Sequence, residues 1–173
     1  MRAPDSNIGN DDFRDLFVSV LPDLHNYVAR QCSVSEVDDL CAEIMSEVYF
    51  HWPWAPAGLA NRRMWVFGFA RNKLLEYQRR KRHSSSLIQK VSSHSPTSAP
   101  DSQNLVAAND RVRRLLAQLP EKERETVYLT VFAGFSSAET AQVLGISIST
   151  VTTRASRARQ HLKKILEQEG KDK

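Results

Sequence analysis

Hydroxyl and guanidinium side chains gather between Thr140 and Leu166, a stretch of the sequence without an acidic residue. Such groups donate hydrogen bonds to the phosphates and base edges of a DNA major groove, and arginine suits guanine in particular. A helix over this stretch has an apolar stripe formed by Val151, Ala155, Ala158 and Leu162. Beside that stripe lie the residues that we predict to contact DNA: Thr150, Thr152, Thr153, Arg154, Ser156, Arg157 and Arg159.

A helix-turn-helix is predicted to position these side chains. Ser136 and Glu139 have the spacing of a capping box at the start of the first helix. Gly145 ends that helix, because glycine readily takes the left-handed backbone that the turn requires, and Ser147 caps the second helix. Ala141 is small enough to let the two helices cross closely. An ordinary surface hairpin is the alternative, but the basic, acid-free second helix favours DNA binding.

A second basic stretch runs from Asn61 to Arg82, where Glu76 is the single acidic residue. Its basic residues are Arg62, Arg63, Arg71, Lys73, Arg79, Arg80, Lys81 and Arg82. Acidic residues gather earlier in the chain, at Glu36, Asp38, Asp39, Glu43 and Glu47. Each of these charged stretches, taken alone, is also consistent with a helix face exposed to solvent. Together they predict a molecule with two basic faces and one acidic face.

Apolar spacing predicts an all-α fold of two small helical domains joined by a flexible linker. Residues 12–82 form the first domain, with a helix or bent helix pair around Pro22, a helix that Ser35 caps, a loop at Pro53 and Pro56, and a helix from 61 to 82. Residues 83–104 form a Ser/Pro-rich linker, and 105–167 form the second domain. In the second domain, helices are predicted over 105–119 and 121–133 ahead of the helix-turn-helix. Residues 1–11 are expected to be disordered, and 168–173 a polar tail.

Composition excludes several functional classes. With 41% hydrophobic and 25% charged residues and no apolar run long enough to span a bilayer, the chain is expected to be cytoplasmic, without membrane insertion of its own. Cys32 and Cys41 are expected to be free thiols packed in the core. Together with His25 they could instead bind a metal ion, but the spacing of these residues matches no common zinc site. No metal and no cofactor are expected. The chain lacks a phosphate-binding Gly-x-x-x-x-Gly-Lys, and its histidines are scattered, so no enzyme is predicted.

Short motifs in both halves resemble the bacterial sigma factors. Leu119-Pro-Glu-Lys-Glu-Arg124, Glu139-Thr-Ala141, Leu144-Gly-Ile-Ser147 and the run from Thr150 to Ala158 resemble region 4. Asp38-Asp-Leu-Cys-Ala-Glu43 resembles region 2.2, and Trp65-Val-Phe-Gly-Phe-Ala-Arg-Asn72 with Glu76-Tyr-Gln-Arg-Arg80 resembles region 2.4. Two regions in this order, joined by a short linker, resemble the extracytoplasmic-function (ECF) group. Thr140 and Ala155 depart from the family pattern, which has larger aliphatic residues there.

The resemblance implies a factor that brings core RNA polymerase to promoter DNA and assists DNA opening. The predicted helix-turn-helix would bind the minus-35 element, with Arg154 and Arg159 as phosphate anchors. The minus-10 element would be bound by Asn61, Arg62, Arg71, Asn72, Lys73, Glu76, Arg79 and Arg80. A base-capture loop would use Trp52 and Trp54, unless these are packing plugs. Core polymerase, through its largest-subunit clamp helices, would contact Asp39, Leu40, Glu43, Ile44 and Glu47.

The resemblance further implies contact with the polymerase flap and inhibition by an anti-sigma factor. A helix-turn-helix regulator that binds duplex DNA without polymerase is the alternative function. It leaves the acidic residues of the first domain and the helix around Asn72 without a role.

Overall fold

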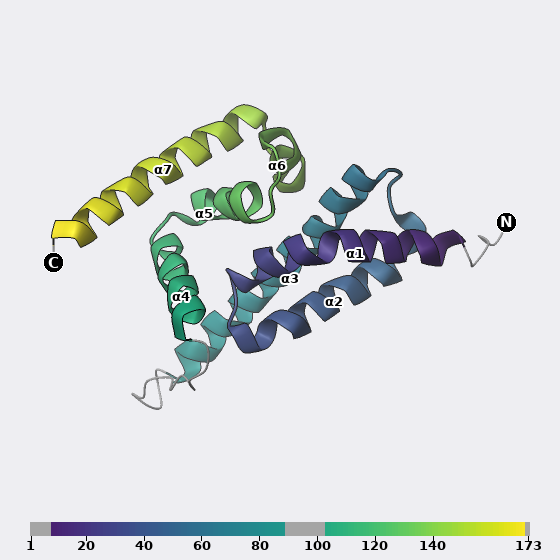
Figure 1. The fold of residues 1–173 in the computed structure, drawn as a ribbon, viewed down its shortest axis with the longest axis horizontal. Helices are drawn as coiled ribbons and strands as arrows, with labels where there is room; N and C mark the ends of the chain where they lie inside the picture. Colours follow the sequence, from purple (N-terminus) through teal and green to yellow (C-terminus); the bar gives the residue numbers. More distant parts are fainter. Residues whose placement is uncertain (1–7, 89–102, 172–173) are drawn as a thin grey trace.

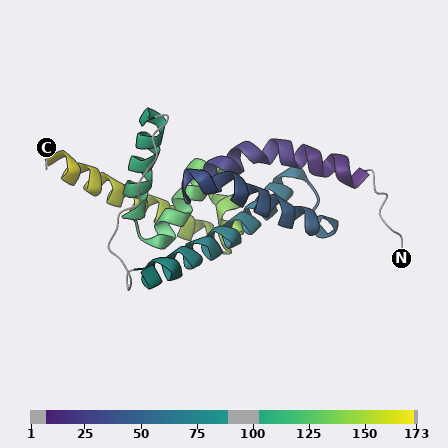
Figure 2. The same ribbon diagram turned by 90° about the horizontal axis from the view of Figure 1, so that it is seen from below.

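The computed structural model describes the backbone of residues 8–88 and 103–171, and the side chains of 11–84 and 110–171. Every regular element within these ranges is helical, as the hydrophobic spacing predicts. The helices α1 to α3 form one part of the molecule and α4 to α7 the other (Figure 1). Helix α1 begins at one end of the molecule and α7 finishes at the other (Figure 1 and Figure 2).

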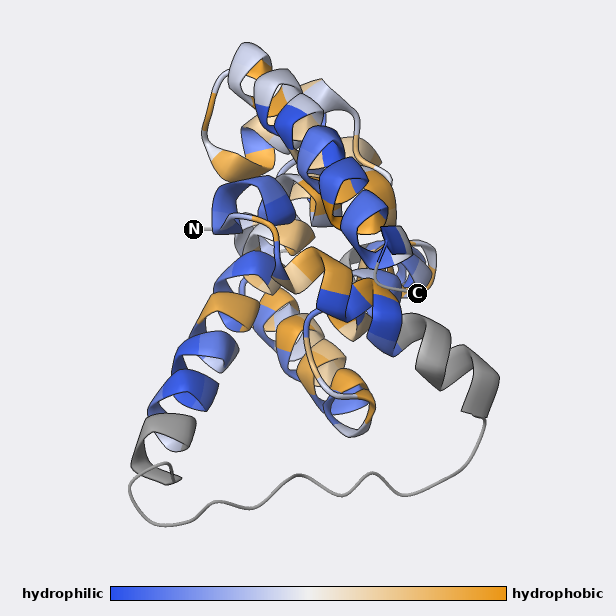
Figure 3. Ribbon diagram, turned by 90° about the vertical axis from the view of Figure 1, so that its left-hand side faces the viewer, coloured by the Kyte–Doolittle hydropathy of each residue, from blue (hydrophilic) through white to orange (hydrophobic). Residues whose placement is uncertain are grey.

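The N-terminal part is a bundle of three helices that contact one another pairwise: α1 (Ile8–Ala29), α2 (Val37–Phe50) and α3 (Leu59–Ile88). Helix α1 continues through Pro22, so the structure selects the single helix over the bent pair. Its inward face buries Leu16, Val20, Leu24 and Val28, which follow the predicted spacing of three and four residues. Figure 3 shows the alternation of hydrophobic and hydrophilic residues that this packing requires.

The helices of the N-terminal half differ from the expected ones at three points. Helix α1 already includes residues 8–11, which were expected to be disordered, and α3 extends to Ile88, inside the predicted linker. Ser35 does not cap α2, because a 3-10 turn over Val34–Glu36 precedes that helix. Residues 89–102 of the predicted linker lie outside the described residues. The short turn Trp52–Trp54 confirms that the prolines interrupt the helical run.

The C-terminal part contains α4 (Gln103–Ala117), α5 (Glu121–Val127), α6 (Ser137–Leu144) and α7 (Ile148–Lys171). Pro120 lies at the N-cap of α5 rather than in its first turn. The predicted helix over 121–133 changes to a π-helical turn at Tyr128–Phe132, where the N–H of Ala133 donates to the carbonyl of Tyr128 at 3.0 Å. Helix α7 includes residues 168–171 of the predicted polar tail.

The two parts share a hydrophobic core. Phe67 of α3 contacts Phe135 with ring centroids 4.8 Å apart, and Tyr27 of α1 contacts Tyr128 at 6.4 Å, both edge to face. Such aromatic pairs contribute about 0.5–1.5 kcal/mol each beyond the area that they bury. The Tyr128 hydroxyl also donates to the carbonyl of Arg30 at 3.4 Å. The two predicted domains therefore pack on each other in this structure; their boundaries stay a prediction.

Candidate nucleic-acid interface

The helix-turn-helix begins with a complete capping box. The N–H of Glu139 donates to the Ser136 hydroxyl at 3.2 Å, and the N–H of Ser136 donates to the Glu139 carboxylate at 2.9 Å. The hydrogen bond from the Ser136 backbone, followed by that from its hydroxyl, lowers the pKa of Glu139 below its usual value. The bonds that the N–H groups of Ser136 and Glu139 donate satisfy two donors that the first turn of a helix otherwise leaves without partners. The predicted start of α6 is thereby confirmed.

Gly145 turns the chain between α6 and α7. Its φ of 65° is left-handed, and the N–H of the next residue, Ile146, donates to the carbonyl of Ala141 at 3.0 Å. The N–H of Thr150 then donates to the Ser147 hydroxyl at 3.2 Å, which caps α7 as predicted. The turn that aims α7 is therefore fixed by local hydrogen bonds and by one left-handed glycine.

Replacing Gly145 with alanine is expected to lower the free energy of unfolding by about 1 kcal/mol, because a Cβ disfavours the left-handed backbone. A Cβ at this position meets nothing within 4 Å, so the loss comes from the backbone alone. The matched control is Gly68→Ala inside α3, where a Cβ also meets nothing within 4 Å. The control should gain about 0.5–1 kcal/mol. Urea unfolding measures both, and losses of equal size would contradict this account of the turn.

Helix α7 presents a polar face to solvent. Val151 and Ala158 are completely buried, while Ala155 and Leu162 are partly buried, which confirms the predicted stripe. Of the predicted DNA contacts, those that are exposed are Thr152, Thr153, Ser156, Arg157 and Arg159; those that are partly buried are Thr150 and Arg154. All seven thus lie together on one helix that the turn at Gly145 orients.

Thr140 lies inside the helix pair with a buried hydroxyl that finds no hydrogen-bond partner among the described residues. An unpaired buried hydroxyl loses its hydration without compensation. Threonine at this position therefore buries an unpaired hydroxyl where an aliphatic side chain would bury none.

Thr140→Val keeps the side-chain shape and is expected to raise the free energy of unfolding by about 1 kcal/mol. Thr126 provides the matched control, since it is equally buried but its hydroxyl donates to the carbonyl of Lys122 at 2.9 Å. Thr126→Val should therefore lower the free energy of unfolding by about 1 kcal/mol. Thermal or urea unfolding gives both values, and a loss of stability in Thr140→Val would refute the assignment.

The second basic region lies on α3 and is only partly available for DNA. Asn72, Glu76, Arg79 and Arg80 are exposed, so this part of the predicted minus-10 surface faces solvent. Arg71 instead pairs with Glu125 of α5. The remaining predicted residues at this surface make contacts within the N-terminal part. They are Asn61, bonded to the carbonyl of Ala57 at 2.9 Å, Arg62, paired with Asp12 at 3.2 Å, and Lys73, paired with Glu47 at 3.2 Å.

Arg63 is a key contact that sequence reasoning did not select. Its guanidinium pairs with Asp23 at 3.1 Å, donates to the carbonyl of Ala133 and lies 4.1 Å from the centroid of the Phe135 ring. It therefore ties α3 to the segment that leads into α6. No local pattern signals this role, because Arg63 and Ala133 are 70 positions apart.

The two tryptophans of the predicted base-capture loop differ sharply. Trp52 packs edge to face on Phe13 with centroids 5.2 Å apart, and the Arg62 guanidinium lies 4.8 Å from its ring centroid. Trp54 is 72% exposed and lies beside His51, whose ring also contacts the exposed Phe50. Trp52 is thus a packing residue, and Trp54 is the one with a face open to a base.

The acidic residues on α2 form an exposed surface, and its predicted apolar members are buried beneath it. Asp39 and Glu43 are exposed, and Glu47 is partly exposed beside Lys73. Ile44 is completely buried and Leu40 is 4% exposed, so both pack in the core of the bundle. Leu40 lines the hollow between α2 and α3 together with Asp39 and Glu43, and the contact of Leu40 and Ile44 with a partner stays a prediction.

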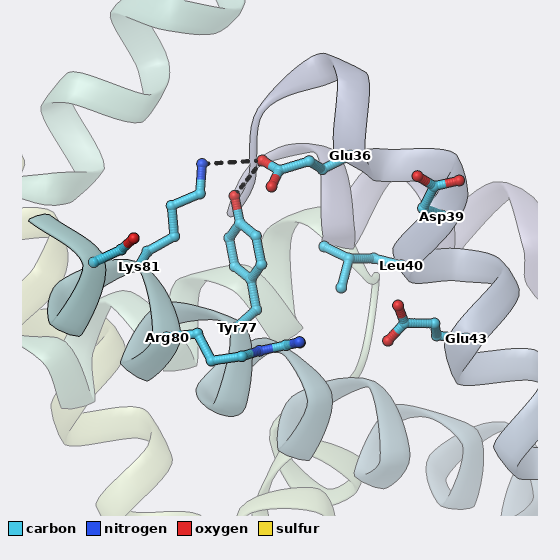
Figure 4. A pocket seen from close by; sticks show the side chains of 8 residues that line it. Glu36, Asp39, Leu40, Glu43, Tyr77, Arg80 and Lys81 are labelled. Carbon is cyan, nitrogen blue, oxygen red and sulfur yellow. Dashed lines mark hydrogen bonds and ion pairs between the residues drawn. The ribbon is translucent and has the colours of Figure 1, made fainter.

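A hollow of about 330 Å³ lies between α2 and α3 beside Asp39 and Glu43 (Figure 4). At its edge Glu36 accepts hydrogen bonds from Ser33 and from Tyr77 Oη, the latter at 2.5 Å, and pairs with Lys81 at 3.1 Å. These bonds, Ser33 first and Tyr77 next, lower the pKa of Glu36 to about 2. Glu36 therefore stays negatively charged beside the acidic residues of α2.

The lowered pKa of Glu36 predicts an acid-sensitive contribution to stability. Because the folded-state value lies below the usual 4.5, the contribution is present above pH 4.5 and is lost as the pH falls towards 2. Tyr77→Phe removes one hydrogen-bond donor and should raise the pKa of Glu36. Ser33→Ala, as a separate variant, removes the donor with the larger effect and should raise this pKa more. NMR titration of the Glu36 carboxyl measures both shifts. An unchanged pKa in both variants would contradict the assignment.

The structure supplies no metal-ligand geometry for the cysteines. Cys32 and Cys41 are both buried, and burial raises the pKa of each thiol to about 11. His25 lies 3.4 Å from Asp38 instead. The described residues include no group of three ligands that could hold a metal ion. Within the same residues, no helix combines the length and the apolar character that crossing a bilayer requires.

Comparison with known proteins covers both parts of the chain. The family model "Sigma-70, region 4" matches residues 109–162. RNA polymerase sigma factor SigZ of Bacillus subtilis is 30% identical over 160 residues, 90% of this chain and 88% of that protein. ECF RNA polymerase sigma factor RpoE of Cereibacter sphaeroides is 25% identical over 94% of this chain and 92% of that protein.

A solved structure has the same arrangement of helices. The sigma factor RpoE in complex with the anti-sigma factor NepR from Bartonella quintana is 25% identical, with a TM-score of 0.72 over 91% of this chain and 98% of that one. CnrH in complex with the cytosolic domain of CnrY, 22% identical with a TM-score of 0.68, has the same fold. With relatives that match nearly the whole chain and a capped helix-turn-helix where region 4 is expected, this protein belongs to the ECF group of RNA polymerase sigma factors.

Proposed function

We propose that this sigma factor directs core RNA polymerase to specific promoters and assists the opening of promoter DNA for initiation. The observation that carries the proposal is the exposed polar face of α7, held by a capped turn, in a chain whose relatives match it over both halves. The chain acts as an initiation factor in the cytoplasm, and the polymerase supplies the catalysis.

Helix α7 is proposed to read the minus-35 element in the major groove. Thr152, Thr153, Ser156 and Arg157 are exposed and are assigned to base edges. The Thr152 and Thr153 hydroxyls donate to the carbonyl of Ser149 at 3.0 and 2.8 Å, so they offer their acceptor lone pairs and methyl groups to DNA. Arg154 and Arg159 are assigned to phosphates, which position the helix without reading sequence.

The exposed side of α3 is proposed to bind the minus-10 element. Asn72 offers an amide to a base, while Arg79 and Arg80 offer charge to phosphates. Arg71 can join them only by exchanging the Glu125 carboxylate for a phosphate, and Lys73 only by leaving Glu47. Binding of this element would thus compete with the contact between α3 and α5.

Trp54 is proposed to stack on a base that leaves the duplex during opening. Its exposed ring, with His51 beside it, offers an aromatic surface of the kind on which single-stranded bases stack. Trp52 would support this surface through its packing on Phe13.

Core polymerase is proposed to bind the acidic side of α2, through Asp39, Glu43 and Glu47. Opposite charge on the clamp helices would speed encounter and fix the register of docking. The C-terminal part is assigned to the polymerase flap. A protein inhibitor is also proposed, because the similar RpoE from Bartonella quintana was solved in complex with the anti-sigma factor NepR.

Selection of promoter fragments tests the proposal that this sigma factor recognises both a minus-35 and a minus-10 element. Reconstituted holoenzyme is used to select fragments from a random DNA pool, and the bound fragments are sequenced. The expected result is two short motifs at a fixed spacing that are enriched only when core polymerase is present. Enrichment by the chain without core would instead indicate a duplex-binding regulator.

A further inference from the structure

Two adjacent hollows lie between the N-terminal and C-terminal parts, and their described lining residues are not among the predicted DNA and polymerase contacts. Their volumes are about 570 and 370 Å³, and they share Gln31, Gln78, Arg113 and Arg124 as lining residues. The turn after α1, residues 30–33, and helix α3 provide one side, and α4, α5 and Tyr128 provide the other. We call this region the interdomain cleft. Its volume suits a ligand of nucleotide size.

The interdomain cleft is strongly cationic. One acidic residue, Asp110, stands among its described lining residues. The basic residues that line it are Arg30, Lys81, Arg82, Arg113, Arg114 and Arg124. Within the described structure Glu36, paired with Lys81 at 3.1 Å, adds one nearby negative charge. A cleft with charge of one sign and protein walls concentrates oppositely charged ligands.

The arginines from the C-terminal part are held in place yet keep donors for a ligand. Arg124 Nη1 donates to the carbonyls of Ala117 at 3.1 Å and Leu119 at 3.5 Å, which fixes the guanidinium at the end of α4. Its other N–H groups make no hydrogen bond to the described residues. The Arg113 guanidinium lies 3.7 Å from the Asp110 carboxylate, and this contact engages only part of its N–H donors.

The cleft also has aromatic and amide walls. Tyr128 is 6% exposed, and its hydroxyl donates a hydrogen bond to the Arg30 carbonyl. The Gln31 amide donates a hydrogen bond to the carbonyl of Tyr27 at 3.1 Å. Gln78 of α3 faces the same space. These contacts keep the walls ordered before a ligand arrives, which lowers the entropy lost on binding.

We infer that the interdomain cleft binds an oligophosphate, either inorganic or carried by a nucleotide. The planar fork of arginine matches phosphate oxygens in two-point hydrogen bonds, and several forks converge here on one space. A phosphate chain concentrates its charge in this volume. An acidic peptide spreads one charge over about 3.3 Å of extended chain per residue and brings backbone groups that need partners of their own.

An oligophosphate in this cleft would join the two parts of the molecule. Its contacts would come from α3 through Arg82 and from α4 and α5 through Arg113, Arg114 and Arg124. It would therefore favour the arrangement in which Arg71 is paired with Glu125 and is withheld from DNA. Resting on the proposed role of α3 in minus-10 binding, this effect would make the ligand a negative regulator of promoter binding.

Titration calorimetry of the full chain with tripolyphosphate, ATP and a decapeptide of glutamate tests the inference, at 150 mM salt without divalent cations. One tripolyphosphate per chain is expected, with affinity reduced about tenfold or more in Arg113→Gln/Arg114→Gln. The matched control Lys163→Gln/Lys164→Gln removes the same charge from exposed positions of α7 and should change affinity less than about twofold.

Arg82→Gln, on the other side of the cleft, should also weaken binding several-fold, and it keeps the test decisive if the double variant fails to fold. Equal affinities for ATP and tripolyphosphate would identify the phosphate chain as the ligand, and tighter ATP binding would identify a nucleotide. No binding of tripolyphosphate, equal losses in the cleft and control variants, or tighter binding of the glutamate peptide would each overturn the inference. The assay contains no polymerase, so its outcome is independent of the proposed function.

Discussion

Arg157→Ala in reconstituted holoenzyme is expected to lower affinity for the cognate promoter by about tenfold or more and to leave affinity for a scrambled minus-35 element nearly unchanged. Arg157 is exposed on the polar face of α7, next to Ser156 and one turn beyond Thr153. An arginine that makes two hydrogen bonds to guanine contributes about 1–3 kcal/mol of discrimination against other bases. Electrophoretic mobility shift or fluorescence anisotropy on both DNAs gives the ratio of affinities.

Arg159→Ala is the matched control, because it removes the same charge from an exposed position on the same helix. As a phosphate contact it should weaken binding to the cognate and scrambled DNAs by similar factors and should reduce the salt dependence of binding. Equal losses on the two DNAs in Arg157→Ala would exclude base reading by this residue.

The double variant Asp39→Lys/Glu43→Lys is expected to reduce affinity for core polymerase by about tenfold or more, most strongly at low salt. Both carboxylates are exposed on α2 and lie beside Glu36, whose lowered pKa keeps a third negative charge there. Reversing two charges turns attraction into repulsion towards a basic partner surface. Binding to immobilised core polymerase at several salt concentrations measures the effect.

Asp11→Lys/Asp15→Lys is the matched control, since it changes the net charge equally at exposed positions of α1. It should leave core binding within about twofold of the parent value once long-range charge effects are screened. Equal losses in the two double variants would show that net charge, rather than the surface of α2, governs binding.

Local patterns predicted the helix-turn-helix well. The capping box at Ser136, the left-handed Gly145 and the cap at Ser147 all depend on residues within a few positions of one another. Ser35 failed as a cap because the 3-10 turn Val34–Glu36 shifted the start of α2, a difference that propensity alone does not reveal. Leu40 and Ile44 had the spacing of core residues, and the core is where they lie.

Contacts between the two parts of the molecule were not predictable from the sequence. Phe67 meets Phe135 and Arg71 meets Glu125 across more than 50 positions, and one sequence carries no signal for such pairs. The Arg71–Glu125 pair withdraws one basic side chain of α3 from solvent, and the pairs of Arg62 with Asp12 and of Lys73 with Glu47 hold two more. The predicted minus-10 residues are therefore divided between an exposed group around Asn72, the exposed Asn61 bonded to Ala57, and a group held by ion pairs within the protein.

Promoter-specific transcription in a purified system tests whether this chain directs core polymerase. Purified core polymerase, with and without this chain, is given a template that contains one selected promoter and an equal template with that promoter scrambled. The account predicts a transcript of defined start only from the intact promoter and only when the chain is present. A chain that binds the promoter DNA but produces no core-dependent transcript from it would contradict the account.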